Sequence, residues 1–243
     1  MPMHVGAAST ALRDVLSGPL RTARVLGVHP SCVYLLAGSE LVALETSDAL
    51  GLPCSVRLAA VRTEGPFARV RRDDSAEVGD GLLRAGPVTV RVARWWAPRR
   101  PRSGRSVCRT DMLAELLAGH PAPVRADGEV GDLLGLGPGL TPAGDDVLAG
   151  LLVGLHHRPD LRDPLAAEVA RLAPTRTTAL SAALLRHAAA GRAVPTLTAV
   201  ADALAGAGQD GDLEPALGRL LAIGDTSGTA LAHGLLRAAR IAA

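Results

Sequence analysis

The sequence predicts an α+β fold: a small N-terminal antiparallel β domain over residues 1–96, a linker over 97–106 and an all-helical domain over 107–243. The first part contains short apolar, β-branched runs separated by Gly, Pro and Ser, which is the pattern of strands and turns. In the last part Ala and Leu dominate, and apolar residues recur at helical spacing. The segment between the two is rich in Pro and Arg, which disfavours both helix and sheet.

In the β domain, a short helix over residues 9–16, with Ser9 as its N-cap, is expected before the strands. Residues 88–92 alternate apolar and polar side chains, as a half-exposed antiparallel sheet requires. Trp95 and Trp96 follow, and we expect them to seal the junction between the domains rather than to bind a ligand. The expected strands are residues 24–28, 32–37, 41–44, 54–61 and 87–95.

In the helical domain, residues 147–155 contain no polar side chain, and a helix that is apolar on all sides is buried. Thr141 suits the N-cap of this helix and Pro142 suits its first position. The expected helices are residues 107–117, 130–134, 142–156, 165–172, 177–190, 196–205, 215–223 and 229–241.

The composition excludes several functional classes. All basic side chains other than His are Arg, because the chain has no Lys, so enzymes that depend on a phosphate-binding or Schiff-base lysine are disfavoured. A net charge of +2 and 2% aromatic residues argue against nucleic-acid binding. The three cysteines form no CxxC pair, the N-terminus does not resemble a signal peptide, and no apolar run is long enough to span a bilayer. We therefore expect a cytoplasmic protein without membrane contact.

A glycine-rich segment, residues 135–146 with the sequence GLGPGLTPAGDD, is the main candidate for a binding site. Gly137 and Gly139 permit close approach of the backbone, and the helix that follows presents its first N–H groups. Such a loop suits an anion or a carbonyl oxygen. Its spacing is not that of a dinucleotide-binding fingerprint.

Two adjacent carboxylates, Asp145 and Asp146, stand at the start of this buried helix. Ionised carboxylates are costly there unless a cation, an Arg or several N–H groups meet them. One interpretation is a catalytic, ligand-binding or metal-binding role, with Mg²⁺ as a possible bridging ion. The other is that both side chains only complement the helix dipole.

Two further segments carry more polar groups than helix capping needs. The first, residues 174–181, contains Arg176, Thr177 and Thr178, and its Arg is suited to a carboxylate or phosphate, or to a pair with one of the two Asp residues. The second, residues 224–229, contains Thr226 and Ser227 in a turn between helices. A plain helix–turn–helix corner is the alternative interpretation of that turn.

Together, the segments GLGPGLTPAGDD (135–146), TRTTALSAALL (175–185) and IGDTSG (223–228) resemble the AllH-type subunit family of bacterial oxamate carbamoyltransferase, formerly a domain of unknown function. The resemblance is expected to cover most of the chain. The third segment departs from the family pattern at Asp225 and Ala230, where the family usually has His and Asp.

The resemblance implies carbamoyl transfer between oxalurate and phosphate, giving oxamate and carbamoyl phosphate, in allantoin catabolism by a multi-subunit enzyme. Asp145 and Asp146 would then be catalytic. Gly137, Gly139, Thr141, Arg176, Thr177, Thr178, Thr226 and Ser227 would bind a small anionic amide or phosphate substrate. No cofactor is required by this interpretation, although Mg²⁺ bridging the two Asp residues is compatible with it.

Three hypotheses follow from the sequence. In the first, the chain is a carbamoyltransferase subunit that works with partner subunits, and Asp145→Ala yields a folded, inactive protein. In the second, it is a non-catalytic ligand-binding or assembly subunit that completes a partner's active site, since no nucleophile and base pair is evident. The third, an ATP-dependent kinase, is disfavoured by the absence of Lys.

Overall fold

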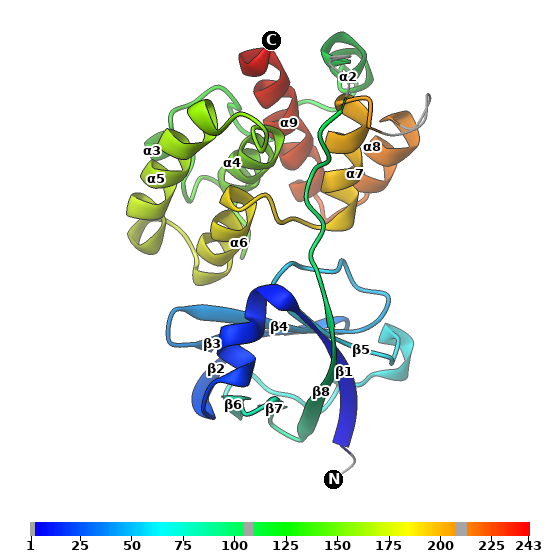
Figure 1. Cartoon of the computed structure of the whole chain (residues 1–243), viewed down its shortest axis with the longest axis vertical. Coiled ribbons are helices and arrows are strands. Elements are labelled where there is room, and N and C mark those ends of the chain that lie inside the picture. The colour runs from blue at the N-terminus through cyan, green and yellow to red at the C-terminus, as the bar shows by residue number, and fades with distance from the viewer. Residues whose placement is uncertain (1–2, 105–108, 208–212) are drawn as a thin grey trace. The chain divides into compact units, whose positions relative to one another are not determined.

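The computed structural model describes residues 3–104, 109–207 and 213–243, and the chain divides into two compact units, residues 1–98 and 99–243 (Figure 1). The first unit is a β-barrel and the second is helical, so the predicted α+β class is confirmed. Residues 105–108, which include Cys108, the end of the predicted linker and the predicted start of a helix, lie outside the described residues.

Eight strands of the described residues form the closed barrel, in the order β1-β5-β4-β3-β2-β6-β7-β8. The predicted first helix is present as η1 (Thr10–Leu12) and α1 (Arg13–Ser17), and the Ser9 hydroxyl accepts from Ala11 N as its cap. Another short helix, η2 (Arg62–Glu64), lies in a connecting segment. The strands are β1 (Met3–Ser9), β2 (Arg21–His29), β3 (Cys32–Ala37), β4 (Glu40–Glu45), β5 (Ser55–Leu58), β6 (Ser75–Gly79), β7 (Leu82–Ala85) and β8 (Val88–Trp96).

The sheet is mixed, whereas the sequence predicts an antiparallel one. β1 pairs with β8 in parallel and β4 pairs with β5 in parallel; the other pairings are antiparallel. The parallel pair β1–β8 closes the barrel, which leaves no open sheet edge. The sequence analysis does not predict β1, β6 or β7. β1 contains Gly and Ala residues with little strand preference, and it is stabilised by pairing with strands that are distant in the sequence on both sides.

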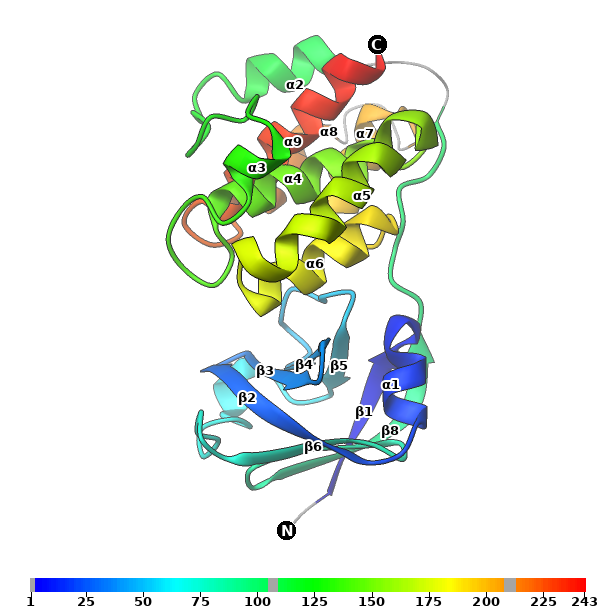
Figure 2. The same cartoon turned by 90° about the vertical axis from the view of Figure 1, so that its left-hand side faces the viewer.

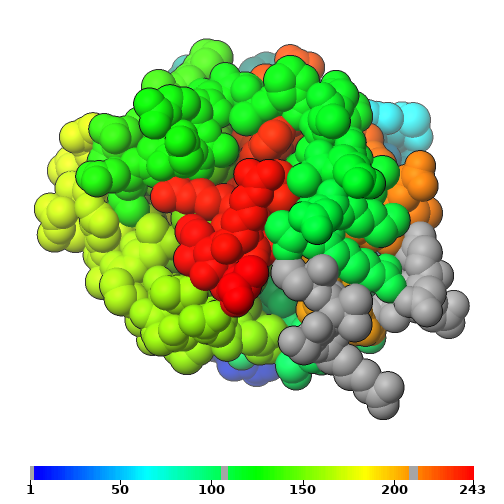
Figure 3. Space-filling view, turned by 90° about the horizontal axis from the view of Figure 1, so that it is seen from above, coloured from blue at the N-terminus to red at the C-terminus, as the bar shows by residue number. Residues whose placement is uncertain are grey.

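The helical unit contains each helix that the sequence predicts within the described residues, with altered ends. α5 is longer than expected, and Thr178 rather than Thr177 directly precedes α6. Figure 3 shows residues near the C-terminus, in red, reaching the surface between green and yellow-green segments. The helices are α2 (Thr110–Leu116), α3 (Val130–Leu133), α4 (Ala143–Gly154), α5 (Pro159–Arg176), α6 (Ala179–Ala189), α7 (Pro195–Leu204), α8 (Leu213–Leu221) and α9 (Ser227–Ala242).

α4 is the central helix of this unit and packs along α9 (Figure 2). A Cβ added at Gly150 would lie 2.1 Å from Leu231 O, and one added at Gly234 would lie 2.1 Å from Val147 O. The two backbones therefore touch at these glycines. Gly154 meets Ala238 one turn further along both helices, so α4 and α9 run parallel and their N-termini lie side by side.

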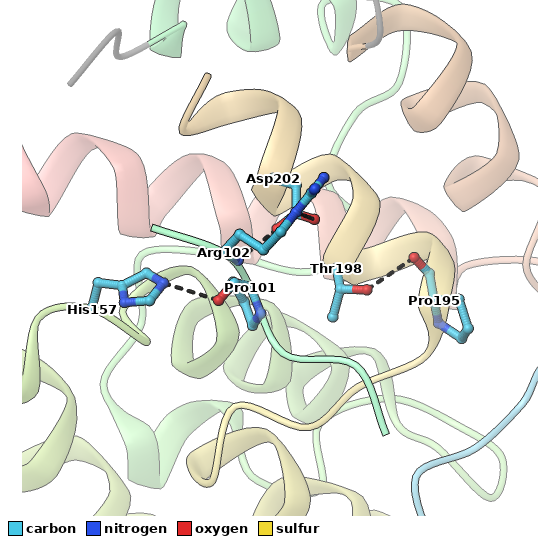
Figure 4. A network of polar contacts seen from close by, with 6 residues as sticks. All are labelled: Pro101, Arg102, His157, Pro195, Thr198 and Asp202. Atoms are coloured by element: carbon cyan, nitrogen blue, oxygen red, sulfur yellow. Dashed lines mark hydrogen bonds and ion pairs between the residues drawn. The ribbon is translucent and has the colours of Figure 1, made fainter. Parts of the chain in front are cut away.

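Part of the segment predicted as a linker lies against the helical unit (Figure 4). Asp202 on α7 accepts from the backbone N of Arg102 at 2.7 Å and from its Nε at 2.9 Å. His157 Nε2 lies 3.0 Å from Pro101 O. These contacts order residues 101–102, which composition alone predicts to be solvated.

We predict that Gly150→Ala destabilises the protein by about 2 to 4 kcal/mol, because the new methyl group meets backbone that cannot yield without separating α4 from α9. Gly218→Ala on α8 is the matched control, since a Cβ there meets nothing within 4 Å. Helix propensity should make that variant neutral or more stable by up to about 1 kcal/mol. Urea unfolding of both variants measures the difference. Equal effects of the two substitutions would contradict the close helix contact.

Candidate active site

The glycine-rich loop connects α3 to α4 and lies largely at the surface. Gly135, Gly137 and Gly139 all have positive φ, at 76°, 113° and 94°. Gly135 also needs to lack a side chain, because a Cβ there would lie 2.1 Å from the carbonyl oxygen of Arg176. Residues 136–140 are exposed, so the loop is accessible to a ligand or a partner.

Asp145 is 2% exposed and holds two of the three segments together. Its Oδ1 accepts from Gly135 N at 2.9 Å, and its Oδ2 accepts from the Thr177 hydroxyl. Both carboxylate oxygens are thus engaged with the chain itself. Asp145 fixes the loop against the start of α6, and this role needs no ligand.

Thr178 makes a second connection between the loop and α6. Its hydroxyl donates to Leu140 O at 2.6 Å and accepts from Ser181 N at 3.0 Å, which caps the helix. The Ser181 hydroxyl also lies 3.4 Å from Leu140 O. The carbonyl group of Leu140, which sequence reasoning misses, is therefore the anchor at the end of the loop.

Asp146 differs from its neighbour. It is 8% exposed, and its Oδ2 is buried with no hydrogen-bond partner in the described part of the chain. Burial raises the pKa of this carboxyl, a hydrogen bond from Ser227 acts in the opposite direction, and the charge of Asp145 raises it further, to about 7. Asp146 is therefore a buried acid able to exchange a proton near neutral pH.

Ser227 donates to Asp146, and Thr141 contacts Ser227 where α4 and α9 begin. The Thr141 and Ser227 hydroxyl oxygens are 3.3 Å apart. Thr141 is not the N-cap that the sequence predicts: Pro142 occupies the cap position and α4 begins at Ala143. The reason is that the Thr141 hydroxyl contacts α9 instead of the first turn of its own helix.

The first N–H groups of α4 are largely occupied. Gly144 N donates to Leu136 O at 2.9 Å, and the amides of Asp145 and Asp146 both donate to Pro142 O. The anion cradle expected at this helix start is thus filled by carbonyl groups of the chain. The exposed loop amides remain as candidates for an anion.

Arg176 and Thr226 lie at the margin of this cluster. Arg176 ends α5 and is exposed, and its Nη2 donates to Gly131 O at 2.7 Å rather than to the oxygens of Asp145. Thr226 is exposed at the N-cap position of α9, and its side chain makes no capping hydrogen bond. Gly224 has φ 57°, as expected for the residue that ends a helix.

The structure gives no support to a metal bridge between Asp145 and Asp146. Both oxygens of Asp145 already accept hydrogen bonds from the chain. Within residues 3–104, 109–207 and 213–243, no three His, Cys, Asp or Glu side chains are grouped so that they could hold a metal ion. In the same residues, every helix is too short or too polar to cross a membrane.

We predict that Asp145→Ala lowers stability by about 3 kcal/mol, because it leaves the Gly135 amide and the Thr177 hydroxyl without their acceptor. The sequence analysis instead expects Asp145→Ala to be folded and inactive. A double-mutant cycle with Thr177→Val should give a coupling free energy of about 1 to 3 kcal/mol in urea unfolding. Asp145→Asn, which keeps an acceptor for Gly135, is the control and should lose less. Additive effects of the two single variants would contradict the contact.

Comparison with known proteins gives one family match. Residues 133–239 match the family model described as oxamate carbamoyltransferase subunit AllH. Neither the curated proteins nor the solved structures gave a match. The matched range lies within the helical unit and contains all three segments of the candidate site. The resemblance to the oxamate carbamoyltransferase subunit AllH family, predicted from those segments, is thus confirmed over residues 133–239, whereas the sequence analysis expects it over most of the chain.

Proposed function

We propose that the chain is a subunit of a carbamoyltransferase that moves a carbamoyl group between oxalurate and phosphate, with oxamate and carbamoyl phosphate as the other pair, in allantoin catabolism. The family match over residues 133–239 is the observation that carries this proposal. The word subunit in the family description supports a complex with other carbamoyltransferase subunits. We expect activity only in that complex.

In this reaction an oxygen of phosphate bonds to the carbamoyl carbon, the carbon–nitrogen bond to oxamate breaks, and the departing nitrogen takes up a proton. We assign the supply of that proton to Asp146. A carboxyl group with a pKa of about 7 serves as a proton donor and acceptor near neutral pH. Asp145 is assigned a positioning role, because both of its oxygens hold the chain together.

We assign substrate binding to hydroxyl groups near Asp146, to the exposed loop and to Arg176. The hydroxyls of Thr141 and Ser227 would exchange hydrogen bonds with the carbamoyl amide. The amides of Gly137 and Gly139 would meet the anionic end. Arg176 would assist them, because its guanidinium has five N–H donors and the contact with Gly131 uses only one group.

A second candidate function is a non-catalytic subunit that completes the active site of a partner. Two observations favour it: Asp145 is engaged internally, and Leu136 and Leu140 of the loop are exposed. Exposed apolar side chains beside a glycine loop suit contact with another protein. In that case the loop would reach into a site whose catalytic groups come from the partner.

The deciding experiment compares Asp146→Asn with the parent chain in the complex reconstituted with its partner subunits. We predict that carbamoyl phosphate release from oxalurate and phosphate falls about 100-fold or more, as expected for loss of a general acid. Glu214→Gln, an exposed carboxylate on α8, is the control and should keep activity within about twofold. A complex that assembles normally and keeps full activity with Asp146→Asn would favour the non-catalytic subunit.

A further inference from the structure

A groove on the outer wall of the barrel has the features of a second binding site. Its volume is about 470 Å³, within the range of small-molecule sites. The polar and aromatic side chains in its wall are those of Ser47, Arg57, Arg94, Trp95 and Trp96. All of its lining residues belong to the barrel unit and lie in the described part of the chain, and none of them is acidic.

Strand register places the two arginines of the groove on either side of one alanine. Ala7 on β1 is the partner of Arg57 on β5 and of Arg94 on β8. Neighbouring strands lie about 4.8 Å apart, so the two arginine backbones are about 10 Å apart across β1. Only a methyl group stands between them. Two long side chains at this separation are able to converge on one anion.

A β-bulge produces this arrangement. The register between β1 and β8 shifts between Gly6 and Ala7: Gly6 pairs with Val92, and Ala7 pairs with Arg94, so Ala93 is passed over. Without the extra residue, Ala93 would stand opposite Ala7. Bulges commonly redirect a side chain in this way beside binding sites.

The chain satisfies the Arg57 guanidinium only in part. Arg57 Nη2 donates to Ser47 O at 2.6 Å, but its buried Nε has no acceptor among the described residues. A buried N–H group without an acceptor costs free energy. Arg94 is exposed on the other side. Glu45, the register partner of Arg57 on β4, interacts electrostatically with Arg57, but no carboxylate lines the groove itself, where an anionic oxygen would lie between the two arginines.

The two tryptophans supply flat, apolar surface next to this charge. Trp96 Nε1 donates to Ala7 O at 3.2 Å, which fixes the indole ring beside the two arginines. The Arg13 Cζ atom lies 4.4 Å from the centre of the Trp95 ring, and this cation–π contact holds that ring as well. Rigid aromatic rings beside paired arginines are suited to a planar organic anion.

We propose that this groove binds a small planar organic anion, with its carboxylate between Arg57 and Arg94 and its planar body against Trp95 or Trp96. This site shares no residue with the Asp146 cluster, which belongs to the helical unit, and it does not depend on the carbamoyltransferase proposal. It also changes the role expected for the two tryptophans, which the sequence assigned to sealing a junction. The charge of the two arginines and the flat rings of the two tryptophans determine the class of ligand.

Tryptophan fluorescence tests the proposal directly, because Trp95 and Trp96 are the two tryptophans of the chain. The probe is benzoate, with benzamide as its neutral counterpart of the same shape, and excitation is set beyond the absorption of both. We expect saturable change with benzoate and at least tenfold weaker binding of benzamide. No saturable change with benzoate, or equal binding of the two probes, would overturn the proposal.

Matched arginine variants locate the bound anion. Arg94→Gln should weaken benzoate binding about tenfold or more, since one charge-assisted contact is lost. Arg91→Gln, three residues earlier on the same exposed strand and outside the groove wall, should change it less than about twofold. Circular dichroism confirms that both variants are folded. Equal effects of the two substitutions, or none from Arg94→Gln, would contradict the site.

Discussion

Gly150 on α4 and Gly234 on α9 allow the two helix backbones to touch, and the candidate site depends on this contact. Because the helices run parallel, their first residues meet at the same end of the pair. That geometry brings Ser227 to Asp146 and to Thr141. A side chain larger than hydrogen at either glycine would separate the helices and with them the hydroxyls that surround the buried carboxyl.

Asp145 and Asp146 are adjacent in the chain but have opposite environments. Both carboxylate oxygens of Asp145 accept hydrogen bonds, one from Gly135 and one from Thr177, and so connect these two residues. Asp146 has a buried oxygen without a partner. Burial disfavours its charge, while the two neighbouring helix N-termini favour it. A group held between such opposed effects is suited to proton transfer, whereas a fully bonded carboxylate is suited to holding a loop in place.

The sequence predicts the elements well where local pattern determines them, as in β3 and in the Ala- and Leu-rich helices. It misses β1, whose Gly and Ala residues are held by distant strands. It also misses the β6–β7 hairpin, although Asp80 and Gly81, both with positive φ, are a turn signal. The three site segments are predicted, but the different roles of the two Asp residues arise from tertiary contacts with α6 and α9. Spacing along one helix cannot distinguish them.

The pH dependence of stability measures whether Asp146 is a buried carboxyl that holds its proton to near neutral pH. Its pKa in the folded state, about 7, lies above the ordinary value of 3.8. Protonation of Asp146 therefore stabilises the folded state fully below pH 3.8, and this stabilisation is lost as the pH rises through 7. Each pKa unit corresponds to about 1.4 kcal/mol. Urea unfolding of the chain and of Asp146→Asn should therefore show the chain losing about 4 kcal/mol relative to the variant between about pH 4 and pH 8. If the difference in unfolding free energy between the chain and Asp146→Asn does not change with pH, the pKa of Asp146 lies in its ordinary range and the carboxyl is not a proton donor near neutral pH.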